Sequence, residues 1–290
     1  KTALSRVSPA TVIVPDSEQI QQVIAELKAT NPQDIVGVFD CDLTLANKPP
    51  ESFHNIRFSE SQIGTLRSIS DAFAIAAIIT ARGRKSTLEA LWRGVDNRQP
   101  IEKLVLASDC GHHVMPEASA VRQPKIYQPI GDMDQAQAAA VTKAIGDLLQ
   151  TVGQHFAHFN GFIVDHRKYC GALVYQGLTH EEAESVHSLF ATEFSDLPHD
   201  LQATLKVAEK RVPQNDGSHS GYIDVMPKAM SKGQTLRGLL QNIPSVAQRV
   251  PQQNGVLLIG GDTRSDIPMM QEAKKMEAEG KFKKVYCFWV

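Results

Sequence analysis

Short apolar runs recur along the chain, and segments with helical periodicity separate them. Five of these runs are dominated by apolar and β-branched residues, at positions 35–39, 74–79, 103–107, 256–259 and 285–290. Runs this short and continuous are typical of strands that are buried on both faces. Because the strands alternate with helices, they predict a parallel sheet with right-handed crossover connections, and hence an α/β fold.

The segments between these runs carry apolar residues at helical spacing. Two of them begin with the spacing of a capping box, Ser59 with Gln62 and Thr179 with Glu182, and Ser231 is a further expected N-cap. The expected helices begin near residue 17 and at Ser59, and cover residues 86–92, 132–152, 179–194, 231–240 and 267–278.

The strand–helix alternation changes after residue 124. A long Ala- and Gln-rich helix is followed by two adjacent strands at 161–167 and 171–175, and then by a helix. Two further strands, at 201–208 and 222–226, flank the turn-rich residues 213–221. This block of helices and antiparallel strands indicates an inserted second domain at residues 125–227, with residues 1–124 and 228–290 forming the first domain.

Composition narrows the class of protein. The net charge is −2, with 42% hydrophobic and 21% charged residues, and no basic block stands out, so we expect neither nucleic acid nor a membrane as partner. The longest apolar run, residues 72–79, is far below the roughly 20 residues of a membrane span. Residues 1–15 lack the apolar stretch of a signal peptide, and the four cysteines are scattered, which favours a reducing, cytoplasmic location.

Acidic side chains follow several of the predicted strands. Asp40 and Asp42 come directly after the first strand, Thr80 after the second, and Asp262 with Asp266 after the fourth. Carboxyl ends of parallel strands are where α/β sheets bind ligands, so these groups are expected to share one site. Two like unit charges about 4 Å apart repel by about 4 kcal/mol at an effective dielectric of about 20. Carboxylates clustered beside a phosphate therefore need a divalent cation, and all-oxygen ligands select Mg²⁺.

These residues also carry a family resemblance that spans almost the whole chain. Asp40-Cys41-Asp42-Leu43-Thr44, Thr80, Lys232 and Gly261-Asp262-x-x-x-Asp266 match, in order, the four motifs of the haloacid dehalogenase-like phosphatases. The resemblance implies a Rossmann-like parallel-sheet core with an inserted α/β cap of the C2 type. It also implies a phosphoric monoester hydrolase that works through an aspartyl-phosphate.

The resemblance assigns a role to each motif residue. Asp40 is the expected nucleophile, and Asp42 is the expected general acid and base. Mg²⁺ would be held by Asp40, the backbone carbonyl of Asp42 and Asp262, with Asp266 as a further ligand or as a residue that supports the ligands. Thr80 would donate its hydroxyl to a phosphate oxygen, and Lys232 would offset the negative charge. Lys228 competes for that last role, although Lys232 stands in the Ser-Lys-Gly context of the family.

Finer matches within residues 125–227 resemble the trehalose-6-phosphate phosphatase branch. Asp165-His166-Arg167 resembles its acid-x-lysine strand, and Asp224 lies in a segment that resembles the run ahead of its catalytic lysine. A small phosphorylated sugar is therefore the expected partner. Arg82, Asp165, Arg167 and Asp224 are the expected substrate-binding residues.

The resemblance leaves other functions open. Val174, Gln176 and Met226 stand where the branch has polar residues, so trehalose 6-phosphate is a plausible but poor substrate. Sucrose phosphate and mannosyl-phosphoglycerate are alternative substrates. A catalytically silent binding protein with this fold is a further alternative, which the intact Asp40 and Asp42 disfavour. A phospho-accepting receiver domain also uses Asp and Mg²⁺, but its compact single domain has no room for residues 125–227.

Overall fold

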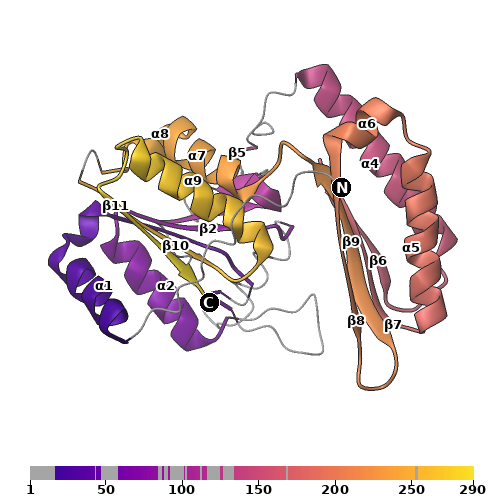
Figure 1. Cartoon of the computed structure of the whole chain (residues 1–290), viewed down its shortest axis with the longest axis horizontal. Helices are drawn as coiled ribbons and strands as arrows, with labels where there is room; N and C mark the ends of the chain where they lie inside the picture. Colours follow the sequence, from indigo (N-terminus) through magenta and orange to yellow (C-terminus); the bar gives the residue numbers. More distant parts are fainter. Residues whose placement is uncertain are drawn as a thin grey trace.

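A computed structural model describes residues 17–42, 44–46, 58–83, 87, 91, 101, 103–111, 113–115, 125–126, 134–167, 169–251 and 254–290. The helix expected at 86–92 lies largely outside these residues, as does Leu43. Figure 1 shows two separate sheets, each covered by its own helices. Among the described residues, no helix is both long and apolar enough to cross a membrane.

The first sheet has seven strands in the described part of the chain. Their order is β11 (Lys284–Trp289), β10 (Val256–Gly261), β1 (Ile35–Phe39), β2 (Ile75–Ile79), β3 (Leu104–Ser108), β4 (His113–Met115) and β5 (Lys125–Ile126). The first five are parallel, and β4 and β5 are antiparallel additions at one edge. The predicted parallel sheet is confirmed.

Helices cover both faces of this sheet. α1 (Ser17–Ala29) and α2 (Glu60–Ala72) lie on one face, and α7 (Lys232–Asn242), α8 (Pro244–Ala247) and α9 (Ile267–Ala278) lie on the other. Alternate residues of each central strand point to the two faces, which is why these strands are apolar throughout. Val36 and Val38, for example, pack with the α7–α9 side, and Ile35 packs with the α1 side.

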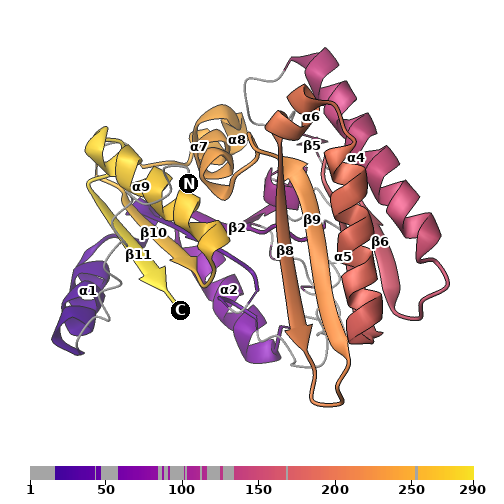
Figure 2. The same cartoon turned by 45° about the vertical axis from the view of Figure 1, so that its right-hand side comes forward.

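The second sheet is antiparallel, with the order β6 (Phe162–His166), β7 (Gly171–Leu178), β9 (His219–Pro227) and β8 (Leu205–Pro213). α4 (Gln135–His155), α5 (His180–Ser195) and α6 (His199–Thr204) accompany it. The core of this unit lies between the sheet and α4 and α5. These two helices lie on the side of the sheet that is turned away from the first sheet, and its other face is turned toward it (Figures 1 and 2).

Local signals in the sequence place several of these helix ends correctly. The capping boxes at Ser59 and Thr179 are both present, and Ser231 caps α7. The strand expected at 201–208 is wrong in its first half, because residues 199–204 form α6 and β8 begins at Leu205. The turn expected at 213–221 is shorter, since β8 and β9 extend to Pro213 and His219. β8 is an edge strand with exposed polar residues, which hide its strand pattern.

The inserted unit begins later than its predicted first residue. Lys125 and Ile126 form β5, which pairs with β4 in the first sheet. The boundary between the two domains therefore lies after Ile126. We otherwise keep the division into a core and a cap at these positions as a prediction.

Close packing between α7 and α9 gives a first test of the fold. A Cβ atom on Gly233 would lie 2.4 Å from the carbonyl oxygen of Pro268 in α9, so the two helices have to shift if Gly233 becomes alanine. We expect Gly233→Ala to lower the free energy of unfolding by about 1–3 kcal/mol.

Gly64→Ala is the matched control for this substitution. Gly64 lies within α2, and a Cβ atom on it would have no neighbouring atom within 4 Å, so alanine there should raise the free energy of unfolding by about 0.5–1 kcal/mol. Urea unfolding of both variants measures the two changes. Equal effects of the two substitutions would contradict the packing argument.

Candidate active site

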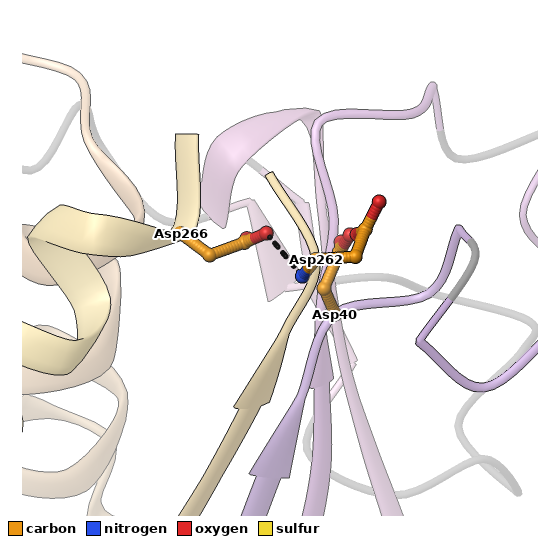
Figure 3. A group of neighbouring side chains, drawn as sticks. All are labelled: Asp40, Asp262 and Asp266. Atoms are coloured by element: carbon orange, nitrogen blue, oxygen red, sulfur yellow. Dashed lines mark hydrogen bonds between the residues drawn. The ribbon is translucent and has the colours of Figure 1, made fainter. Parts of the chain in front are cut away.

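Three carboxylates meet at the carboxyl ends of the two central strands. Asp40 follows β1, Asp262 follows the neighbouring β10, and Asp266 precedes α9 (Figure 3). Each offers an oxygen, and these oxygens lie within 4.8 Å of one another. The strand pairing accounts for the meeting, because Phe39 is in register with Gly260 and the Asp40 amide donates to the Gly260 carbonyl at 2.9 Å.

A buried lysine faces these carboxylates. Lys232 is the first residue of α7, and its Nζ lies 2.7 Å from Asp40 Oδ1 and 2.5 Å from Asp266 Oδ1. Its side chain is only 4% exposed. Lys228, the competing lysine, instead donates to the Ala203 carbonyl of the cap at 2.6 Å. Of these two lysines, Lys232 is therefore the one that contacts the acidic cluster.

The protonation preferences of the cluster reflect its burial and its excess negative charge. Burial raises the pKa of Asp40, and the nearby Asp266 adds to this effect while Lys232 opposes it. Burial also raises the pKa of Asp262. For Lys232, burial works toward a lower pKa, but the carboxylates of Asp40 and Asp266 raise it above its ordinary value. Three ionised carboxylates and one ammonium leave a charge of two negative units, which a divalent cation would balance.

The oxygen donors of the cluster suit Mg²⁺, but they do not contribute equally. Asp266 uses Oδ1 for Lys232 and Oδ2 for the backbone amides of Asp262 and Thr263, at 3.1 and 3.0 Å. It therefore fits a supporting role better than that of a direct ligand. Asp40 and Asp262 remain as carboxylate donors. The Asp42 carbonyl accepts the Thr44 amide at 2.6 Å and keeps a second lone pair.

Gly261 lets Asp266 adopt this position. A Cβ atom on Gly261 would lie 2.5 Å from the Cβ of Asp266, so a larger residue would push the carboxylate away. Besides the backbone amides of Asp262 and Thr263, the Thr263 hydroxyl also donates to Asp266 Oδ2, at 3.0 Å. This explains why the motif combines Gly261 with Asp266.

Asp42 and Thr80 lie on neighbouring strand ends and are both linked to Arg82. Thr80 is buried after β2, and its Oγ1 accepts the backbone amide of Arg82 at 3.1 Å. The Arg82 guanidinium binds the Asp42 carboxylate with two nitrogens, Nε at 2.7 Å and Nη2 at 2.5 Å. The structure thus brings together Asp42 and Arg82, to which the sequence analysis assigns separate roles.

Three of the four expected substrate-binding residues, Asp165, Arg167 and Asp224, lie on the face of the cap sheet that is turned toward the core, whereas Arg82 lies in the core after β2. Leu173 and Ile223 pack under α4 and α5, so their neighbours Ala172 and Asp224 point the other way. Asp165 and Asp224 are both in register with Ala172, one on each side of it. Arg167 joins them, since its Nε and Nη2 donate to Asp165 Oδ2 at 2.9 and 2.6 Å.

Arg167 also reaches across to the core. Its Nη1 donates to the Ala81 carbonyl at 2.9 Å, and its Nε lies 3.5 Å from Asp109 Oδ1. Asp109, which follows β3, is buried and is not among the predicted site residues. A signal for it is present in the sequence, because it is one more acidic residue at the carboxyl end of a buried parallel strand.

The burial of Asp224 has a cost in stability when its carboxyl group is ionised. Burial raises the pKa of Asp224 from 3.8 to about 6, with Arg167 opposing and Asp165 adding to the shift. The folded protein therefore binds this proton more tightly than the unfolded chain, so stability falls as the pH rises from about 4 to about 6.

Asp224→Asn tests this cost, because the amide keeps the shape of the side chain and does not titrate. We expect the variant to unfold with a free energy up to about 3 kcal/mol higher than wild type above about pH 6, and with a similar one near pH 4. Urea unfolding across this pH range measures the difference. A difference that does not change with pH would show that the charge of Asp224 is not the cause.

Solved structures similar to this chain were found, but no similar sequence was found. No protein-family model matches the chain, and no curated protein sequence matches it. The C-terminal domain of Candida albicans trehalose-6-phosphate phosphatase superposes with a TM-score of 0.60 at 15% identity, covering 89% of this chain and 79% of that one. The C-terminal domain of the C. albicans trehalose synthase regulatory protein gives 0.56 at 9% identity, covering 92% and 87%. The predicted fold class, an α/β core with a parallel sheet and a second, inserted α/β unit, is therefore confirmed.

Proposed function

We propose that this chain is a Mg²⁺-dependent phosphatase that hydrolyses a sugar phosphate of the trehalose 6-phosphate type through an aspartyl-phosphate. The observation that carries the proposal is the position of Lys232, held between Asp40 and Asp266 beside Asp262. A buried cation among strand-end carboxylates is suited to bind a phosphoryl group and the nucleophile that attacks it.

The first half of the proposed reaction transfers the phosphoryl group to the protein. A carboxylate oxygen of Asp40 attacks phosphorus, and the bond from phosphorus to the sugar oxygen breaks. Asp42 gives its proton to that leaving oxygen. Lys232 stabilises the negative charge on the phosphoryl oxygens, and Thr80 donates a hydrogen bond to one of them. Arg82, which binds the Asp42 carboxylate in this structure, has to release it for this step.

The second half returns Asp40 to its starting form. Asp42, now ionised, accepts a proton from water as the water attacks phosphorus, and the bond between phosphorus and Asp40 breaks to release inorganic phosphate. Mg²⁺ held by Asp40, Asp262 and the Asp42 carbonyl would neutralise the phosphate charge and reduce its repulsion of Asp40. Asp266 keeps Lys232 and the loop after β10 in place.

Two alternatives have specific support. Met226 packs with Cys170 and Met230 where the trehalose branch has arginine, which supports another phosphorylated sugar, such as sucrose phosphate or mannosyl-phosphoglycerate. The second structural neighbour is named as a regulatory protein, so a regulatory role without catalysis is the other alternative for this chain. A cytoplasmic location remains a prediction, in keeping with the free thiols of Cys41 and Cys287.

Phosphate release from a panel of phosphorylated sugars tests the activity. We expect turnover to require Mg²⁺ and to fall to background in Asp40→Asn, because the amide keeps the strand-end packing but cannot act as the nucleophile. Rapid acid quenching should trap a phosphorylated wild-type protein. Full activity after exhaustive treatment with EDTA would exclude this mechanism.

Two lysine variants are the matched controls for this test. Lys232→Ala should lose about a hundredfold or more in kcat, as is usual when a group that stabilises the transferring charge is removed. Lys228→Ala removes a nearby lysine that contacts the cap backbone, and it should keep most of the activity. The reverse order of effects would mean that the motif lysine has been assigned wrongly.

The proposed role of the cap in substrate recognition gives a separate prediction. Asp165→Ala or Asp224→Ala should lower kcat/KM for the phosphorylated sugar by about tenfold or more, because the sugar hydroxyls lose their carboxylate partners. A small aryl phosphate makes no such contacts and should be affected far less. Asp200→Ala, an exposed change in α6, is the control. Equal losses on both substrates would show that the two aspartates support the fold only.

A further inference from the structure

Arg167 belongs to the cap and contacts residues of both the cap and the core. Its Nε and Nη2 bind Asp165 within the cap, while its Nη1 donates to the Ala81 carbonyl of the core and its Nε lies 3.5 Å from Asp109. The Arg167 and Asp109 side chains are 13% and 4% exposed. A pair this well shielded from water is screened far less than an ion pair on the surface.

The backbone of Asp109, directly after β3, has an unusual conformation. Its φ of 52° lies in the left-handed region, which residues other than glycine seldom occupy. Its backbone amide donates to the Arg82 carbonyl at 2.8 Å. The surrounding contacts therefore fix the Asp109 carboxylate at the cap–core boundary.

These contacts connect the two functional regions of the chain. Asp42 is bound by Arg82, the Arg82 carbonyl accepts the Asp109 amide, and Asp109 faces Arg167 of the cap. Ala81, which accepts from Arg167, lies between Thr80 and Arg82 in the same loop. The orientation of the cap is thus tied to the loop that carries Thr80 and holds Asp42.

We propose that Asp109 is a positioning residue that holds Arg167 at the cap–core boundary, so that Arg167 contacts the sugar only while the cap is docked on the core. The inference rests on the proposed function and adds a specificity residue from the core to those of the cap. Asp109 acts through Arg167 and does not touch the substrate.

A double-mutant cycle tests this inference. Asparagine tolerates the left-handed conformation, so Asp109→Asn removes the charge with little change to the backbone. We expect it to lower kcat/KM for the phosphorylated sugar by about tenfold in wild type and by less than about twofold in an Arg167→Gln background, because contacting residues have non-additive effects. A purely structural role for Asp109 would give equal losses in both backgrounds and would overturn the inference.

Small-angle X-ray scattering provides a readout that does not depend on activity. Loss of the boundary contact should increase the radius of gyration of Asp109→Asn and Arg167→Gln relative to wild type, and Asp200→Asn in α6 should leave it unchanged. If no phosphorylated sugar is hydrolysed, the proposed function fails, while the scattering still decides whether Asp109 docks the cap. Unchanged scattering in both variants would overturn the docking role.

Discussion

The arrangement of this protein depends on the neutralisation of carboxylates that two adjacent parallel strands bring to one edge. Asp40 and Asp262 have to lie close together, because β1 and β10 are in register up to the strand ends that these residues follow. Lys232 supplies the only positive charge among the described contacts of Asp40 and Asp266, and its burial leaves little water to screen the attraction. Removing one partner would leave a buried charge unpaired, a change that typically costs about 3–5 kcal/mol.

The position of Lys232 links this charge balance to the cap. The segment before it is anchored to the cap, because the Lys228 amide donates to the Thr204 carbonyl at 2.7 Å and Lys206 Nζ donates to the Met230 carbonyl at 2.6 Å. Ser231 then caps α7, and Gly233 packs against α9. The connection between the domains therefore ends directly before the lysine that the cluster requires.

The sequence allowed the central strands and the main capped helices to be predicted, because those signals are local. Residues 35–39 form a strand buried in one sheet, and the Ser59 capping box satisfies its own helix end. Edge features were predicted less well, since β8 owes its length to pairing with β9 and not to an apolar pattern. Contacts between distant residues left no local signal. The pairing of Arg82 with Asp42 and that of Arg167 with Asp109 join segments about 40 and 58 residues apart, and only folding brings them together.

Val174 and Met226, which stand where the trehalose-6-phosphate phosphatase branch has polar residues, have different places in the cap sheet. Met226 packs with Cys170 and Met230 in the segment that leads to α7. Val174 lies on the face turned toward the core and is in register with Tyr222 and Ile163. It therefore belongs to an apolar and aromatic row beside the row that contains Asp165 and Asp224.

A sugar presents both hydroxyl groups and C–H faces. Its hydroxyls suit the carboxylates of the charged row, and its C–H faces can pack on apolar side chains and on an aromatic ring such as that of Tyr222. A charged row beside an apolar and aromatic row would therefore suit a ligand that has both hydroxyl groups and C–H faces. Under the proposed function, Val174 in place of a polar residue would change how the sugar is oriented more than whether a sugar fits.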